Sequence, residues 1–296
     1  MKKTVHFTVL FTIFLLFAGC ASSKVEEVNS CNTFDDDTFS FSFLGKRPVV
    51  NIEINDVIFQ FLIDSGANHN VFYNKGLKKA GAFLKDFDYE SLNESLYYTI
   101  TISGGNIGSV KFSVETDDKT LEYDGILGIP FLLQKSDVVT FDYKNNKVIF
   151  SQADIEGKKE PLIPVSLAGN APVYFMEIII ENRKEYFLFD TGNYAFVLRS
   201  NYDTEKAIYP TEDVILELLN RDYKKTNRFK KVKLAPFSFG NAKYDGMTAI
   251  YNDYFYSHAS LFAKRTFSSF SSAGYPFFKD RIIQVNFKEN TIIIVE

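Results

Sequence analysis

An internal repeat constrains the fold of this chain more than any other feature of its sequence. Residues 61–66 read Phe-Leu-Ile-Asp-Ser-Gly, and residues 187–192 read Phe-Leu-Phe-Asp-Thr-Gly. A valine follows each aspartate by seven residues, at Val71 and Val197. Self-similarity of this kind indicates two copies of one structural unit, each built around the same turn.

The two copies also end alike. Gly-Ile-Pro-Phe at 128–131 corresponds to Gly-Tyr-Pro-Phe at 274–277, and after each the sequence predicts a strand, a polar turn and a final strand. We therefore predict an all-β protein of two related lobes with a few short helices. The first copy of the repeat spans 41–155 and the second spans 156–296.

The composition fits a sheet protein. The chain has 296 residues, of which 46% are hydrophobic, and it is rich in aromatic residues, with 31 Phe and 17 Tyr. Aromatic and β-branched residues are typical of strands. Two stretches predict helices instead: 74–85 in the first copy, and 211–219 in the second, where Thr211 precedes two acidic residues and an apolar run in the manner of a helix cap.

Cysteine and histidine are too scarce for several kinds of site. The cysteines are Cys20 and Cys31, near the N-terminus, and the histidines are His6, His69 and His258. A disulfide scaffold, a cysteine nucleophile, a His-ligated metal and a Ser-His-Asp triad are therefore not expected. The net charge of −4 gives no indication of nucleic-acid binding. Any chemistry must depend on carboxylates, and we predict no metal and no other cofactor.

Residues 1–20 have the pattern of an export signal, with two lysines followed by a short apolar stretch. The segment ends in Leu-Phe-Ala-Gly-Cys at 16–20, which resembles the lipobox of bacterial lipoproteins. That resemblance implies lipid attachment at Cys20, a flexible polar tether at 21–40, and a place in the cell envelope, in the periplasm or at the outer-membrane surface. The alternative is an ordinary cleaved signal peptide with a chance cysteine.

The repeated Asp-Ser/Thr-Gly motif is the candidate functional site. One such tripeptide occurs by chance in roughly one chain in ten of this length, but two at matching places in a repeat are far less probable by accident. The apolar run before each motif predicts a buried strand, and the glycine allows a tight turn that leaves the aspartate at the end of the strand. The hydroxyls of Ser65 and Thr191 could cross-link the two turns by hydrogen bonds.

Asp-Ser-Gly-Ala at 64–67 and Asp-Gly-Ile-Leu-Gly at 124–128 resemble the aspartic peptidases, specifically the retropepsin-like family and its duplicated, pepsin-like relatives. In that family an apolar-apolar-Gly segment packs behind the active-site loop. The second copy departs further from the pattern, with Asp-Thr-Gly-Asn at 190–193 and Ser-Ala-Gly at 272–274. The resemblance implies two acid-protease-type β-barrel lobes with an active-site cleft between them.

The resemblance also implies a mechanism. Asp64 and Asp190 would form the catalytic pair, hold one water between them and share one proton, because two like charges so close cannot both ionise cheaply. The implied substrate is a polypeptide, and the implied state is a monomer with both aspartates in one chain. The supporting residues of the active-site loops are Ser65, Gly66, Ala67, Thr191, Gly192 and Asn193, and the structural glycine segments contain Ile126, Leu127, Gly128 and Gly274.

Two further expectations concern the surroundings of the pair. Ala67 offers no side-chain hydrogen bond to a carboxylate, whereas Asn193 can, so Asp64 is expected to titrate higher and activity to lie nearer neutral than strongly acidic pH. Members of the family cover the cleft with a hairpin flap. Its position here corresponds to 86–98 or to the glycine-rich stretch 101–106, and in the second copy to the basic run 221–233.

Two rival hypotheses remain open at this stage. The chain could be a non-catalytic peptide- or ligand-binding lipoprotein that kept the duplicated fold, or its first copy could act only by pairing with the first copy of another molecule. A structural surface protein would leave both motifs unexplained. The placement of Asp64 relative to Asp190 distinguishes these hypotheses, because only an intramolecular pair requires the two carboxyls to meet within one chain.

Overall fold

The computed structural model describes residues 38–81, 98–104, 107–115, 122–151, 153–166, 171–198, 209–216, 227–251 and 271–296. Within these ranges most residues lie in strands, and the helices are short: α1 (Asn74–Ala80), α2 (Ile129–Lys135) and α5 (Tyr275–Phe278). None of these helices is long and apolar enough to cross a membrane. The mostly β architecture is as predicted. The predicted signal peptide, Cys20 and most of the tether lie outside the described residues.

The first half of the chain forms hairpins and short strands. Its elements are β1 (Thr38–Leu44), β2 (Arg47–Ile54), β3 (Val57–Ile63), β4 (Val71–Tyr73), β5 (Tyr98–Gly104), β6 (Gly108–Glu115), β7 (Gly125–Leu127), β8 (Val138–Asp142) and β9 (Lys147–Ser151). Two-residue turns join the first three strands, and all four turn residues have positive φ, which matches the twist of a hairpin: Gly45, Lys46, Asn55 and Asp56.

The second half repeats this plan with additional strands. Its elements are β10 (Lys159–Val165), β11 (Val173–Ile180), β12 (Arg183–Phe189), β13 (Phe196–Leu198), β14 (Tyr209–Leu216), β15 (Asn227–Lys233), β16 (Phe237–Phe239), β17 (Ala242–Tyr244), β18 (Thr248–Tyr251), β19 (Ser271–Ala273), β20 (Ile282–Asn286) and β21 (Thr291–Val295). The turn at Glu181 and Asn182, again with positive φ, corresponds to the turn at Asn55 and Asp56.

The sequence repeat is also a repeat of strand pairing. In the first half β3 pairs in parallel with β7, β7 pairs antiparallel with β4, and β4 pairs in parallel with β6. In the second half the same order joins β12, β19, β13 and β18. The registers match as well, since Ile63 lies opposite Leu127 and Phe189 lies opposite Ala273. The two Asp-Ser/Thr-Gly motifs therefore follow equivalent strands in equivalent surroundings.

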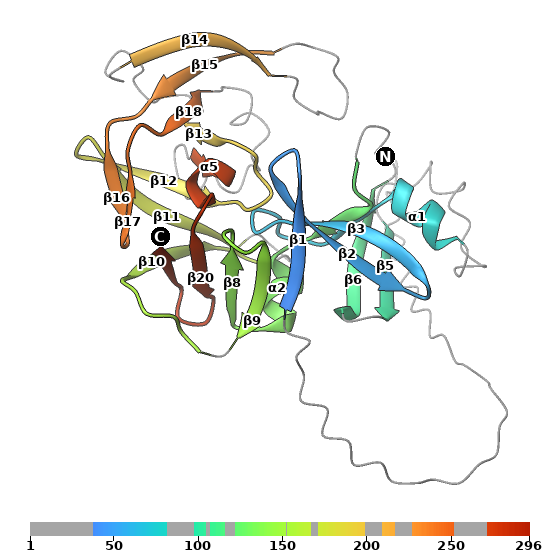
Figure 1. The fold of residues 1–296 in the computed structure, drawn as a ribbon. Coiled ribbons are helices and arrows are strands. Elements are labelled where there is room, and N and C mark those ends of the chain that lie inside the picture. The colour runs from blue at the N-terminus through green and yellow to red at the C-terminus, as the bar shows by residue number, and fades with distance from the viewer. Residues whose placement is uncertain are drawn as a thin grey trace, which may run out of the picture.

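One sheet joins the two halves, in the strand order β1, β9, β8, β20, β21, β10. Figure 1 shows β8 and β20 side by side at its centre. Gln284 lies opposite Thr140 there, and its amide donates to the Thr140 hydroxyl over 2.9 Å. Buried rings of both halves also meet: Phe141 and Phe189 have their centroids 5.8 Å apart. The halves therefore share both backbone hydrogen bonds and core.

The structure corrects one helix prediction. Residues 209–216 form strand β14, which pairs antiparallel with β15, so the predicted helix at 211–219 is wrong where it is described. The run Val214-Ile215-Leu216 is mostly β-branched, and β15 supplies a hydrogen-bonding partner along its length. Tertiary pairing outweighed the cap-like start at Thr211. The other predicted helix is confirmed as α1, although it ends earlier, at Ala80.

The predicted flaps fall largely outside the described residues, since 82–97 and 217–226 are not described. The glycine-rich stretch 101–106 belongs to the hairpin of β5 and β6, in which Gly104 lies opposite Gly108. Gln134 of α2 donates to the carbonyl of Ser109 over 2.8 Å. This contact places the start of β6 against α2. Of the basic run 221–233, the described residues 227–233 form β15.

Candidate active site

Each motif aspartate is positioned by the neighbouring parallel strand. Asp64 follows β3, and its N–H donates to the carbonyl of Leu127 in β7 over 3.0 Å. Asp190 follows β12, and its N–H donates to the carbonyl of Ala273 in β19 over 3.2 Å. The two aspartates therefore leave their strands at the same point of the same local structure.

A glycine behind each loop allows the loop and the following helix to approach closely. A Cβ added to Gly128 would lie 2.6 Å from the carbonyl oxygen of Ala67, and one added to Gly274 would lie 2.2 Å from that of Asn193. The next residue binds the same carbonyl in each case: the N–H of Ile129 donates to Ala67 over 2.9 Å, and that of Tyr275 donates to Asn193 over 2.8 Å. Only glycine fits at these two positions without displacing the loop.

The two loops are cross-linked through their hydroxyls, as the sequence predicts. The N–H of Ser65 donates to the Thr191 hydroxyl, and the N–H of Thr191 donates to the Ser65 hydroxyl, each over 2.9 Å. Each hydroxyl then donates across to the other copy, Ser65 to the carbonyl of Phe189 and Thr191 to that of Ile63, again over 2.9 Å. Both side chains are fully buried, so all four hydrogen bonds are shielded from water.

The cross-link brings the two aspartates together. A Cβ added to Gly66 would lie 2.7 Å from Cγ of Asp190, and one added to Gly192 would lie 2.4 Å from Cγ of Asp64. Each glycine thus makes room for the aspartate of the other copy. The two carboxyls share a hydrogen bond, and both residues remain partly accessible to solvent. The residues predicted as the pair and as its loop supports are therefore assembled in one place.

The environment of the pair favours a single shared proton. Burial raises the pKa of Asp64, and hydrogen bonds from the Gly66 N–H, over 2.8 Å, and from Asp190 partly offset that effect. Burial raises the pKa of Asp190 well above its ordinary value, and the negative charge of Asp64 raises it further. The pair therefore favours one shared proton, and the pKa of Asp190 is raised more strongly than that of Asp64. The pKa of Asp64 is raised, as expected, with burial as the largest cause, and the expected activity nearer neutral pH stays a prediction.

The two carboxyls also differ in the side chains that surround them, and the Ser272 hydroxyl lowers the pKa of Asp190 against the larger effect of burial. The amide of Asn193 does not reach the carboxyl; it donates to the hydroxyl of Ser272 over 2.8 Å, and that hydroxyl donates to Oδ2 of Asp190 over 3.1 Å. Ile126 stands at the matching place in the first copy, because Leu62 lies opposite Ile126 as Leu188 lies opposite Ser272. Ser272 was missed at the sequence level, although its place in the repeat, beside the strand that precedes Asp190, could have identified it.

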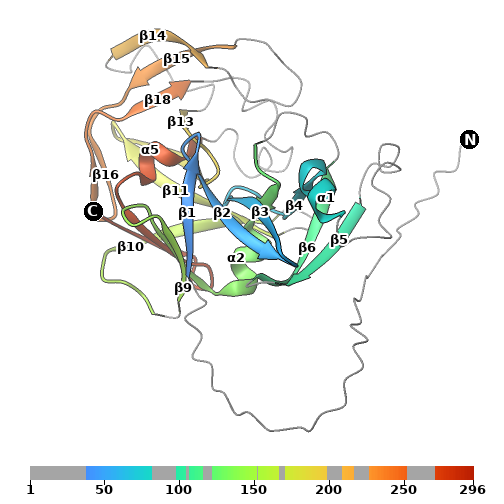
Figure 2. The same cartoon turned by 45° about the vertical axis from the view of Figure 1, so that its right-hand side comes forward.

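Arg47 is a second residue that the sequence did not single out. It opens β2, directly after the turn at Gly45 and Lys46, and its guanidinium lies 5.1 Å from the ring centroid of Tyr194. Its positive charge lowers the pKa of both Asp64 and Asp190. In Figures 1 and 2 the tip of the β1–β2 hairpin points toward β13 and α5 of the second half. No signal in the sequence links the hairpin to the motif, since only the fold brings them together.

The site can hold a water between a carboxylate and a carboxylic acid, which together accept one proton and donate another. No group of three or more His, Cys, Asp or Glu side chains suited to a metal ion lies within the part of the chain that the structure describes. Comparison of the sequence with models of known protein families, and with curated proteins, found no match. What the site does is therefore argued from its own geometry.

Proposed function

We propose that this chain is an aspartic endopeptidase that hydrolyses peptide bonds with a water activated between Asp64 and Asp190. The fold we assign to it is a pair of acid-protease-type β-barrel lobes, 41–155 and 156–296, with the catalytic pair between them. The observation that carries the proposal is the mutual contact of the two carboxyls on loops that Ser65 and Thr191 cross-link. A structural protein has no use for two largely buried carboxyls pressed together, since their repulsion costs stability.

The unequal environments of the two aspartates suggest their roles. Asp64, as the carboxylate, removes a proton from the water while the water oxygen attacks the peptide carbonyl carbon. Asp190, as the acid, donates its proton to the carbonyl oxygen, which gives a neutral tetrahedral diol. The C–N bond then breaks as Asp190 takes back a hydroxyl proton and Asp64 gives its proton to the leaving nitrogen. Both residues return to their starting states, so no cofactor is needed.

The contacts between the two copies favour a pair within one molecule. The cross-link and the sheet through β8 and β20 join residues of the same chain, so the site is complete without a second copy. We propose that the peptidase acts as a monomer on polypeptides. We further propose that it is held at the cell envelope by a lipid on Cys20, with residues 21–40 as its tether.

The test is cleavage of a peptide library by the wild type, Asp64→Asn and Asp190→Asn. We expect either substitution to lower kcat/KM by at least about 10³-fold, because each removes one partner of the proton transfer. Asp56→Asn is a matched control: Asp56 is exposed in the turn at the opposite end of β3, and asparagine tolerates its positive φ. We expect Asp56→Asn to cleave like the wild type.

The other outcomes identify the rival hypotheses. Loss of cleavage in Asp64→Asn alone would indicate pairing between molecules. Binding of library peptides without cleavage by the wild type would indicate a ligand-binding lipoprotein. Full activity in both variants would overturn the assignment of the catalytic pair.

A further inference from the structure

The tip of the β1–β2 hairpin places two adjacent positive charges beside the candidate active site. Lys46 is the second turn residue and Arg47 the first residue of β2, and Arg47 lies opposite Leu44 across the hairpin. The turn conformation, with φ of 56° at Gly45 and 69° at Lys46, fixes the direction in which the chain enters β2. The backbone of Arg47 is held by its pairing with Leu44 of β1, and from Val49 onward β2 also pairs with β3.

Arg47 contacts the second copy through an aromatic ring. Its guanidinium lies over Tyr194, the residue directly after Asn193 of the active-site loop. Stacking of this kind orients the planar guanidinium and leaves its N–H donors at the edge of the plane free to bind. The charge is near enough to the reacting carboxyls to act on both of them.

Arg47 acts on Asp64 and Asp190 through its charge, but neither cation forms a contact ion pair in the described residues. Within those ranges no Asp or Glu carboxylate forms an ion pair with Lys46 or Arg47, and no hydrogen bond uses the donors of the Arg47 side chain. Arg47 is nevertheless half-buried. A partly desolvated guanidinium presents five N–H donors, and its best partner is a carboxylate that binds two of them at once.

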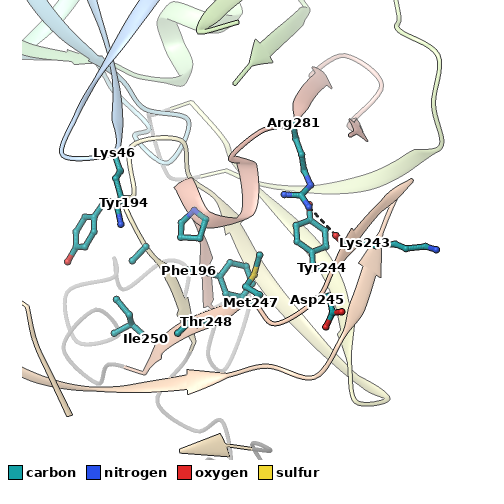
Figure 3. Close-up of a pocket in the computed structure, with 12 residues that line it drawn as sticks. Lys46, Tyr194, Phe196, Lys243, Tyr244, Asp245, Met247, Thr248, Ile250 and Arg281 are labelled. Carbon is teal, nitrogen blue, oxygen red and sulfur yellow. Dashed lines mark hydrogen bonds between the residues drawn. The ribbon is translucent and has the colours of Figure 1, made fainter. Parts of the chain in front are cut away.

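A cavity of about 670 Å³ begins beside this stack. In Figure 3, Lys46 and Tyr194 lie together at one end and Arg281 over Tyr244 at the other, while the side chain of Lys243 points away. The Arg281 guanidinium already has partners. It donates to the carbonyl of Lys243 over 3.0 Å, and one of its nitrogens lies 3.8 Å from a carboxylate oxygen of Glu296. The uncommitted positive charge is therefore at the Lys46 end, next to Arg47. Between the ends, the apolar side chains of Phe196, Met247, Ile250 and Pro276 line part of the wall, and Asp245 and Thr248 line another part.

We propose that Arg47 is a specificity-determining residue that binds a carboxylate of the polypeptide substrate next to the scissile bond. The neighbouring cavity takes an adjacent apolar side chain, so the substrate class is a polypeptide with an acidic group beside an apolar one. The carboxylate can belong to a Glu or Asp side chain or to the C-terminus of the substrate. This inference deepens the proposed peptidase function and rests on it.

The test compares matched peptides built on any sequence that the wild type cleaves. Glu replaces Gln at each position flanking the scissile bond in turn, and a separate pair differs only in a free or amidated C-terminus. We expect the acidic member to be favoured by about tenfold or more in kcat/KM at one position, which is typical for a charge-assisted bidentate contact. Arg47→Met should abolish that ratio, and Arg47→Lys should reduce it, because lysine keeps the charge but not the planar fork.

A variant with the opposite charge at position 47 distinguishes lost recognition from poor folding. Arg47→Glu should prefer Lys over Glu at the same position, a gain that misfolding cannot produce. Arg183→Met is the matched control, since Arg183 also follows a two-residue turn with positive φ but lies at the far end of β12 from Asp190. This control should keep the wild-type ratio. Equal cleavage of the Glu and Gln peptides by the wild type, or an unchanged ratio in Arg47→Met, would overturn the proposal.

A binding measurement separates this proposal from the peptidase proposal. Fluorescence anisotropy of the labelled Glu and Gln peptides with Asp64→Asn protein reports recognition without cleavage. Tighter binding of the Glu peptide, lost in the Asp64→Asn, Arg47→Glu double variant, supports carboxylate recognition even if the wild type cleaves nothing. Cleavage with no acidic preference supports the peptidase and rejects the role of Arg47.

Discussion

The two copies of the repeat use the same backbone and different side chains. Around Asp64 and Asp190 the main-chain hydrogen bonds correspond one to one, and a glycine closes the back of each loop. Two of the differences bear on the polar surroundings of the carboxyls: Ala67 against Asn193, and Ile126 against Ser272. Backbone geometry therefore brings the two carboxyls together, and the side chains give them unequal surroundings, in which the Ser272 hydroxyl lowers the pKa of Asp190 against the larger effect of burial.

The inequality has a chemical consequence. Asp64 is stabilised as an anion by a backbone donor, the N–H of Gly66, whereas Asp190 receives a hydroxyl donor from Ser272 that Asn193 orients. A polar residue at position 272 weakens the match to the apolar family pattern. In the structure that residue contacts the carboxyl directly, so the departure from the pattern is part of the candidate site.

The glycines behind the loops should show the largest effects on stability. Gly274→Ala places a Cβ 2.2 Å from the carbonyl oxygen of Asn193, and Gly128→Ala places one 2.6 Å from that of Ala67. Because both obstacles are backbone atoms, we expect each substitution to lower the free energy of unfolding by more than about 3 kcal/mol, with Gly274→Ala the more severe. Urea denaturation followed by circular dichroism measures the difference.

Gly45→Ala is the control for this comparison. A Cβ there meets no atom within 4 Å, so only the positive φ of 56° is unfavourable, at a cost of roughly 1–2 kcal/mol. If Gly274→Ala cost no more than Gly45→Ala, the loop and the segment behind it would not be in the close contact that the structure shows.

The hydroxyl cross-link should be equally important from both sides. Ser65→Ala and Thr191→Val each remove one hydroxyl and leave a buried N–H and a buried carbonyl of the other copy without that partner. We expect each substitution to lower the free energy of unfolding by about 2–3 kcal/mol, and the two losses to agree within about 1 kcal/mol. A double-mutant cycle should give a coupling energy of at least about 0.5 kcal/mol, because the two hydroxyls close one network.

Ser42→Ala provides the baseline, since Ser42 is exposed on β1 and should change stability by less than about 0.5 kcal/mol. A large cost from one side of the cross-link and none from the other would show that the two loops do not depend on each other equally.

The sequence predicted the parts of this fold that depend on local pattern. The repeat, the strands before each aspartate and the cross-link through Ser65 and Thr191 could all be predicted, because apolar runs, glycine turns and short hydroxyl side chains have strong local preferences. The prediction failed at 211–219, where a cap-like start suggested a helix and pairing with β15 produced a strand. Propensity is a weak guide where a partner strand is available.

The residues of the candidate site that were missed depend on contacts between distant segments. Arg47 reaches Tyr194 across the two halves, and Ser272 reaches Asp190 through the parallel pairing of β12 and β19. Neither contact follows from spacing along the chain. We expected the Asn193 side chain to hydrogen-bond directly to a carboxyl. Its amide donates instead to the hydroxyl of Ser272, and that hydroxyl donates to Asp190.

Ser272→Ala should shift the pH dependence of activity. This is the smallest expected effect, and it best isolates the difference between the copies. The Ser272 hydroxyl hydrogen-bonds to the ionised form of Asp190 and so lowers the pKa of that carboxyl against the larger effect of burial. Removing the hydroxyl raises the pKa further. Asp190 must be protonated to act as the acid, so the alkaline limb of the kcat/KM profile should move to higher pH.

The acidic limb is expected to stay in place, because it reports ionisation of Asp64, which Ser272 does not contact in the described structure. Asn193→Ala keeps the hydroxyl but removes the amide that orients it, so it should shift the alkaline limb in the same direction by less. The rate at the optimum should change by less than about tenfold, as for the loss of one hydrogen bond. A shift of the acidic limb instead would assign the proton to Asp64 and reverse the roles of the two copies.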